Sequence, residues 1–214
     1  MSLIYTFNSI WFNIPEHHEI AIFAYMKEML RQHIEQVVCL TDDEYAIVRQ
    51  HFSIKSCKKG GFLIEKGLSV RYVYLVISGL LKLVYHDKTG REHIISFAME
   101  DWWESDYPAW FSRQPASLSL QCIEDTEVYC LTLESYQSIC AELRKIEHFF
   151  LHKANRGHLA SQDRILSFLT ATPREKYEQM LLKQPKLIQR VPKAVLAAYL
   201  GVSRETLSRL WRNN

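Results

Sequence analysis

The residues with the clearest chemistry lie near the end of the sequence, where two arginines and a glutamate follow a serine. Arg204, Glu205 and Arg209 have the spacing of residues on one helix, and Ser203 is a favourable N-cap for it. Arginine can donate two hydrogen bonds to a guanine edge, and glutamate can accept one from a cytosine amino group. The segment therefore carries side chains that can read bases in a DNA major groove.

A preceding helix must hold this segment in place. Residues 192–200 carry an apolar stripe at helical spacing, and Pro192 suits the first helical position. Gly201 ends that helix, because glycine adopts left-handed backbone angles without strain. Leu207 and Leu210 then face inward from the second helix. The pair has the pattern of a helix-turn-helix; an ordinary helical hairpin with a solvated charged face is the alternative.

Charge is spread unevenly along the 214 residues, whose formal net charge is +2. Residues 160–214 contain 10 Lys/Arg and 4 Asp/Glu, a net of +6, so the rest of the chain carries −4. A basic C-terminal part on an acidic body is typical of nucleic-acid binding. Chance asymmetry is the alternative.

The composition, 48% hydrophobic and 23% charged, is that of a soluble globular protein of one or two domains. No apolar run approaches the ~20 residues of a membrane span. The first residues lack the basic start of a signal peptide. We therefore expect a cytoplasmic protein without a membrane partner.

Metal and redox motifs are absent from the sequence. The five cysteines form no C-x-x-C pair, and the histidines form no H-E-x-x-H. His86 and His93 flank a turn, but no third convincing ligand accompanies them. We expect no metal, no cofactor and no catalytic activity; a metal-dependent enzyme on a jelly-roll fold is the alternative that this ligand count disfavours.

The remaining sequence predicts a β-rich centre between helices. Residues 17–36 have an apolar helical stripe, and the Thr41–Glu44 capping box opens a short helix to about His51. Six runs rich in Val, Ile, Tyr and Leu predict strands of an antiparallel sandwich or barrel: 62–67, 72–79, 80–87, 92–98, 119–123 and 127–133.

Helices follow the strands. Residues 134–169 predict one short and one long helix, and Thr172 with Pro173 and Glu175 predicts a capped helix to about Lys183. Residues 187–191 are interpreted as a short strand.

One face of the long helix carries small and apolar residues. Phe150, Ala154, Gly157, Ser161 and Ile165 recur at spacings of about four. Such a stripe suits a helix-on-helix dimer contact, and packing against the chain's own sheet is the equal alternative.

This arrangement resembles the Crp/Fnr family of bacterial transcription regulators over nearly the whole chain. Residues 203–209, SRETLSR, are similar to the family's recognition-helix motif, in which an Arg, a Glu and a second Arg read bases. The resemblance implies an α+β fold in three parts. These are an antiparallel β jelly-roll of the cyclic-nucleotide-binding type (1–135), a long dimerisation helix (136–170) and a helix-turn-helix domain (171–214).

The resemblance also implies partners and contacts. It implies a homodimer that reads a palindromic site in double-stranded DNA, with RNA polymerase as a further partner. Arg204, Glu205 and Arg209 would contact bases, and Ser203 and Thr206 would contact phosphate. The full set of implied DNA contacts is Ser203, Arg204, Glu205, Thr206, Ser208, Arg209, Arg212 and Lys193.

The effector pocket is where the chain departs from the family. A cyclic-nucleotide site carries a Gly-Glu pair, and about ten residues later an arginine that binds the phosphate, followed by Ser or Thr. The first pair aligns here with Glu104-Ser105 or Trp103-Glu104, and the second with Ala116-Ser117 or Pro115-Ala116. Neither register supplies the arginine, although Arg113 is nearby. The possible pocket comprises Trp103, Glu104, Ser105, Asp106, Ala116 and Ser117.

We therefore place the chain with family members whose cyclic-nucleotide site is degenerate, and we expect no response to cyclic AMP or cyclic GMP. With only Cys39 in its N-terminal part, the chain also lacks the family's iron–sulfur cysteine cluster. The nearby aromatic residues, which could line an effector pocket or belong to the core, are Trp102, Trp103, Tyr107, Trp110 and Phe111. The alternative function is a ligand-sensing β-domain whose C-terminal helices make protein contacts.

Overall fold

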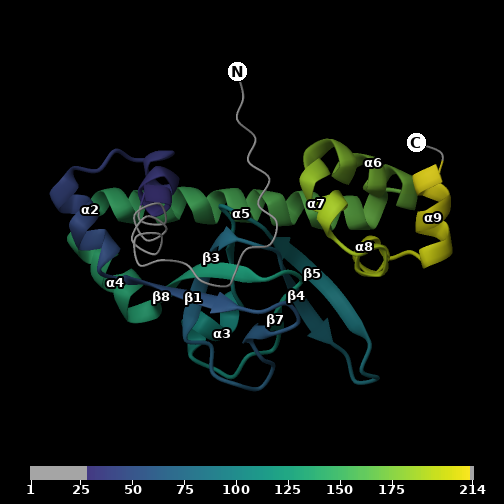
Figure 1. Ribbon diagram of the computed structural model, residues 1–214, viewed down its shortest axis with the longest axis horizontal. Helices are drawn as coiled ribbons and strands as arrows, with labels where there is room; N and C mark the ends of the chain where they lie inside the picture. The colour runs from purple at the N-terminus through teal and green to yellow at the C-terminus, as the bar shows by residue number, and fades with distance from the viewer. Residues whose placement is uncertain (1–27, 213–214) are drawn as a thin grey trace, which may run out of the picture.

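The computed structural model describes the backbone of residues 28–212 and the side chains of residues 28–209. A β-sandwich lies beside one long helix, with a small helical group at each end of that helix (Figure 1). The predicted helix of residues 17–36 falls mostly outside the described residues, and its described part is helical over residues 28–35.

Two antiparallel four-stranded sheets form the sandwich. Their strands are β1 (Phe52–Cys57), β2 (Phe62–Ile64), β3 (Tyr72–Ser78), β4 (Leu81–His86), β5 (Glu92–Ala98), β6 (Trp103–Glu104), β7 (Ser119–Cys122) and β8 (Thr126–Thr132). The first sheet has the order β1-β8-β3-β6 and the second has the order β2-β7-β4-β5. The six predicted strands and the antiparallel sandwich are confirmed.

Three elements of this part were not predicted. β1 has few neighbouring apolar residues, and β6 spans only two residues, so neither gives a clear apolar run. The third is the short helix α3 (Tyr107–Ser112), which Asp106 caps. It contains three of the aromatic residues that the sequence offered for a pocket or for the core.

Apolar side chains form three layers, one between the sheets and one on the outer face of each. The inner layer includes Leu83, Leu120 and Val128. Residues 28–35 and the helices α2 (Asp42–Arg49), α4 (Leu133–Glu142) and α5 (Arg144–Thr170) cover the first sheet. The C-terminal helices cover the second sheet, because they share one buried cluster with residues of β4 and β5.

Local capping signals set several helix starts. The Thr41 side chain caps α2, and the Thr172 side chain caps α6 (Pro173–Lys183), each in a capping box with the glutamate three residues later. The predicted pair of a short and a long helix is confirmed as α4 and α5.

Two local predictions were wrong. Residues predicted as a short strand at 187–191 mostly belong to a helix, α7 (Pro185–Arg190), which buries Leu187 and Ile188. A short apolar run does not distinguish a strand from a buried helical turn. Pro192 is the N-cap of α8 (Lys193–Leu200) rather than its first residue, with an extended ψ of 137°.

The C-terminal half of α5 exposes apolar side chains to solvent. Ile146 and Phe149 are buried near its start, whereas Leu159, Ile165 and Leu169 are 61%, 60% and 75% exposed. From Ala154 to Ile165, the small-residue stripe is exposed and does not pack against the chain's own sheets. Among the described residues, no helix is both long and apolar enough for a membrane span.

Candidate nucleic-acid interface and effector site

The turn between α8 and α9 (Arg204–Arg212) is built from short-range hydrogen bonds. Gly201 ends α8 with a φ of 71°, as predicted, and the Val202 N–H then donates to the Ala197 carbonyl. The Ser203 hydroxyl accepts from the Thr206 N–H at 3.1 Å, so Ser203 is the N-cap that the sequence predicted. The two helices of the predicted pair are therefore both present, in the predicted order.

The outward face of α9 carries the predicted base-reading side chains. Arg204, Glu205 and Arg209 are exposed, and together with Ser208 they border the same open surface of the helix. Leu207 on the opposite side is 1% exposed and belongs to the cluster beneath the helix. The side chains of Leu210 and Arg212 lie outside the described residues.

Hydrogen bonds along α9 give its first turn a local order. The Arg209 guanidinium donates to the Thr206 hydroxyl at 3.4 Å. Hydrogen bonds from the backbone N–H of Glu205 and from the Ser203 hydroxyl lower the pKa of Glu205, with smaller contributions from the Arg204 and Arg209 charges. Glu205 is thus held as a carboxylate, which is the form that accepts from a cytosine amino group.

Three further predicted DNA contacts lie near the starts of the two helices. Lys193 is exposed at the start of α8. Ser203 and Thr206 hydroxyls lie 3.2 Å apart at the N-terminus of α9, where the first backbone N–H groups and the helix dipole favour an anion. The arrangement can therefore present donors to both bases and phosphates.

The predicted effector residues gather where β6 leads into α3. Glu104, Ser105 and Asp106 are all buried, with Asp106 fully inaccessible to solvent. Ser105 donates through its hydroxyl to the Tyr72 carbonyl at 3.1 Å, which fixes this segment to β3. Ser117 lies against Asp106, so the structure brings four of the six candidate residues together.

Asp106 occupies an anion-binding site, here called the cradle, which is formed by donors of Ala109, Ser117 and Leu118. Its Oδ2 accepts from the Ser117 N–H at 2.8 Å, the Ser117 hydroxyl at 3.0 Å and the Leu118 N–H at 2.9 Å. Its Oδ1 accepts from the Ala109 N–H at 3.3 Å, which caps α3. In one of the two sequence registers, Ser117 stands where the family has the serine of its phosphate-binding pair. The donors that could hold a cyclic phosphate thus already hold a carboxylate of the chain.

Glu104 faces the space between the two sheets. Ser96 on β5 donates to its Oε2 at 2.5 Å, and the Ser105 N–H donates to its Oε1 at 3.1 Å. Burial raises the pKa of Glu104 to about 7, although both hydrogen bonds act in the opposite direction. Ser96 was missed by the sequence analysis, because only the pairing of β4 with β5 and of β3 with β6 places it opposite Glu104.

Two other candidates lie away from this cluster. Trp103 points to the other face of β6 and donates through its indole N–H to the Nε2 of His33 at 2.9 Å. Arg113 forms an ion pair with Glu134 at 2.7 Å, so in this structure it does not replace the missing phosphate-binding arginine.

The remaining candidates have structural roles. Ala116 pairs through its backbone with Gly67 and Leu68. Trp110 is buried in the core beside the first sheet, whereas Tyr107 and Phe111 on the same short helix are 38% and 55% exposed. Within the described ranges, no group of three or more His, Cys, Asp or Glu side chains could hold a metal ion.

Comparison with known proteins agrees with this fold. Residues 54–142 match the family model of the cyclic nucleotide-binding domain. No curated protein is significantly similar to the chain in sequence.

Solved structures extend the likeness beyond that domain. FixK2 from Bradyrhizobium japonicum superposes with a TM-score of 0.67 at 18% identity, over 76% of this chain and 83% of FixK2. The c-di-GMP responsive global regulator CLP from Xanthomonas campestris gives 0.64 at 15% identity, over 81% of this chain and 91% of CLP. A protein of Eubacterium rectale, assigned to the transcriptional regulators of the Crp/Fnr family, gives 0.62 at 16% identity, over 81% and 83%.

Residues 54–142 are therefore similar to the cyclic nucleotide-binding domain, and over 76–81% of its length the chain shares the fold of these three solved structures.

Proposed function

We propose that the chain is a homodimeric transcription regulator that reads a palindromic DNA site with α9. The observation that carries this proposal is the exposed arginine–glutamate–arginine face of α9, held over a buried leucine in a helix-turn-helix. The fold shared with a structure assigned to the Crp/Fnr regulators supports it. This function is binding without catalysis, and it makes RNA polymerase the expected further partner and the cytoplasm the expected location.

The exposed face of α5 supports the homodimer. Its small residues from Ala154 to Ser161 would allow a second α5 to approach closely, and its exposed leucines and isoleucine would be buried in that contact. Two α9 helices would then enter successive major grooves about 34 Å apart. In this organisation residues 1–135 form the effector domain, 136–170 the dimerisation helix and 171–214 the DNA-binding domain.

We also propose that cyclic AMP and cyclic GMP are not effectors. A cyclic phosphate would have to displace the Asp106 carboxylate from its four hydrogen bonds, or lie beside it without a cationic partner. Both arrangements are unfavourable, because a buried anion needs a compensating charge or donors. Calorimetric titration with each nucleotide should therefore give no binding heat at millimolar concentration.

The test of DNA reading begins with selection of a preferred site from random duplexes. We expect the purified full chain to select a palindrome and to bind it at least 1,000-fold more tightly than random DNA at fixed salt. We also expect the affinity to fall steeply with rising salt, because phosphate contacts release counterions.

The competing hypothesis is a ligand-sensing protein whose C-terminal helices make only protein contacts. Absence of duplex binding, or a salt slope near zero, would support this competitor and contradict the proposal.

A further inference from the structure

Three turns at one end of the β-sandwich converge on a single arginine. Gly79 lies between β3 and β4, Glu100 between β5 and β6, and Glu124 between β7 and β8. The Gly79 carbonyl and the two carboxylates form what we call the carboxylate socket. Arg190, the last residue of α7, enters it from the C-terminal helices.

The fit between Arg190 and the socket uses every nitrogen of the guanidinium. Nη1 donates to Glu100 Oε2 at 2.7 Å, and Nη2 donates to Glu100 Oε1 at 3.0 Å. Nε donates to Glu124 Oε1 at 3.1 Å, and Nη2 donates to Glu124 Oε2 at 2.6 Å. Nη2 also donates to the Gly79 carbonyl at 2.8 Å. Both carboxylates are bound in the two-pronged geometry that makes arginine pairs strong.

A hydrogen bond and close packing around Gly79 hold the socket on the side of the sheet. The Gly79 N–H donates to Glu100 Oε1 at 2.9 Å. Gly79 has a φ of 104°, and a Cβ atom there would lie 2.5 Å from the Thr126 hydroxyl, so only glycine fits. The Arg190 side chain is 26% exposed, compared with 40% for Glu100 and 35% for Glu124, so the pairs are only partly open to solvent. Partial burial in a network makes these pairs stronger than isolated surface ion pairs.

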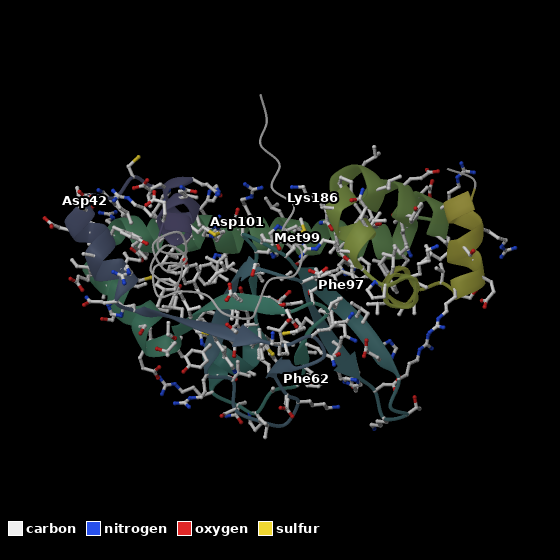
Figure 2. The ribbon with its side chains drawn as sticks, in the orientation of Figure 1. Asp42, Phe62, Phe97, Met99, Asp101 and Lys186 are labelled. Atoms are coloured by element: carbon white, nitrogen blue, oxygen red, sulfur yellow. The ribbon has the colours of Figure 1, made fainter. Side chains whose placement is uncertain are left out.

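A second arginine fixes the neighbouring contact. Arg164 on α5 lies 3.7 Å from the ring centroid of Tyr199 on α8, and it donates to the Ile94 carbonyl on β5 at 3.1 Å. The Tyr199 ring also lies 4.8 Å from the ring of Phe97 on β5. Figure 2 shows Phe97 on β5 and Met99 just after this strand, on the side of the sandwich that faces the C-terminal helices. The sheet, the long helix and α8 therefore meet around one tyrosine.

The position of α9 follows from these contacts. Arg190 is separated from α8 by only two residues, and α7, α8 and α9 share one buried cluster through Leu187, Leu196 and Leu207. Movement of α7 out of the socket would therefore carry α9 with it.

We infer that Arg190 is a positioning residue for DNA reading, which holds α9 at a fixed orientation on the β-sandwich by docking into the carboxylate socket. The inference rests on the proposed function. In a dimer whose two copies meet through α5, this orientation also sets the separation of the two α9 helices. Arg190 itself needs no contact with DNA.

The first experiment compares Arg190→Gln with Arg174→Gln in the full chain. Arg174 is a matched control, because its ion pair with Glu178 at 2.7 Å lies within α6 and does not reach the sheet. Amide hydrogen exchange followed by mass spectrometry should show at least 10-fold faster exchange over β5 and α8 in Arg190→Gln only. Circular dichroism should show unchanged helix content, and affinity for the selected site should fall at least 10-fold. Unchanged exchange and affinity would overturn the inference.

The second experiment changes the socket instead, by the double substitution Glu100→Gln and Glu124→Gln. Removal of two negative charges would strengthen DNA binding if charge alone acted. The positioning role predicts the opposite, a loss of at least 10-fold in specific affinity together with the faster exchange seen in Arg190→Gln. Equal or tighter binding would overturn the inference, and this variant also decides the question if Arg190→Gln does not fold.

The two proposals can fail separately. If the wild-type chain binds no duplex DNA, the proposed function is wrong. If it binds DNA but Arg190→Lys, which keeps one charge without the two-pronged geometry, behaves as wild type in both assays, the positioning role is wrong.

Discussion

The outward face of α9 and the site around Asp106 both contain groups that bind anions, yet they differ in what those groups already hold. On α9, Arg204 is exposed, and Arg209 makes one long hydrogen bond, of 3.4 Å, to Thr206. Around Asp106, by contrast, the Ser117 and Leu118 donors hold a buried carboxylate at 2.8–3.0 Å. The first region has donors available to a ligand, whereas the second has used them within the fold.

This difference shows how to distinguish a surface whose donors can bind a ligand from a site whose donors are already paired within the fold. Residue type alone would assign both regions to phosphate or base recognition. A donor that is buried and paired must lose its partner before a ligand can use it, and that exchange brings little net free energy. An exposed arginine exchanges only water, so it remains free to recognise a partner.

Substitution of Asp106 is the most direct way to break this contrast. Asp106→Ala removes the acceptor of three N–H groups and one hydroxyl in a buried site. We expect the free energy of unfolding to fall by about 3–5 kcal/mol in urea titration. The control Asp163→Ala removes an exposed carboxylate paired with Lys183 and should change it by less than about 0.5 kcal/mol.

The same variant should also free the donors around residue 106 for an added anion. Inorganic phosphate at millimolar concentration should raise the melting temperature of Asp106→Ala more than that of the wild type, because only the variant has free donors at this buried site. A loss below about 1 kcal/mol, or equal phosphate effects, would contradict the assignment of Asp106 as the occupant of the cradle.

The pH dependence of Glu104 gives the next largest effect. Its pKa is raised from 4.5 to about 7 in the folded chain, so protonated Glu104 favours folding below pH 4.5. That contribution is lost as pH rises through 7, and it amounts to about 3 kcal/mol. Glu104→Gln stays neutral, so its stability relative to wild type should rise by about this amount between pH 4.5 and 8. Parallel stability curves from urea titrations would show that Glu104 ionises normally.

The exposed apolar face of α5 allows the same comparison for apolar groups, because its side chains are available to a second copy of the chain. Ile165→Glu should weaken the dimer by at least about 2 kcal/mol, because an isologous contact loses the isoleucine on both sides. Gln162→Glu adds the same charge at an exposed position off the small-residue stripe and should have little effect. Sedimentation velocity over a concentration series measures both, and a wild-type monomer at micromolar concentration would refute the predicted interface.

The smallest expected effect concerns base reading by Arg209. Arg209→Ala should weaken specific DNA binding by about 1–3 kcal/mol and relax the preference at one position of the site. Lys186→Ala is the control for charge, since Lys186 is exposed on α7, at a distance from α9 (Figure 2). It should reduce affinity slightly and equally for all sequences. If Arg209→Ala, like the control, lost affinity equally for the specific site and for random duplexes, Arg209 would not be a base-reading residue.

Prediction from sequence succeeded where short-range contacts decide the structure. The Thr172 capping box and the Ser203 cap each join residues three positions apart, so the sequence alone contains both partners. The strands from 62 to 133 were found because their apolar runs are dense. Prediction from sequence failed at α7, because its short apolar run is compatible with either a helix or a strand.

The candidate effector site was predicted as a set of residues but not as an arrangement. The absence of the phosphate-binding arginine could be read from Ala116 and Pro115. That Asp106 takes the donors of Ser117 could not be read, because α3 must first fold back to bring them together across 11 positions. Trp103 was included, although the alternation of β6 turns it to the opposite face.

The sequence by itself determined the capped helices, the sheet-forming runs and the charged face of α9, because each depends on neighbours within a few residues. Only the tertiary structure decided that Asp106 occupies the cradle and that Arg190 meets Glu100 and Glu124, at separations of 90 and 66 residues. Arg190 and Arg209 are similar residues in a basic segment, and the sequence treats them alike. Folding distinguishes them, because it surrounds one with carboxylates and leaves the other in solvent.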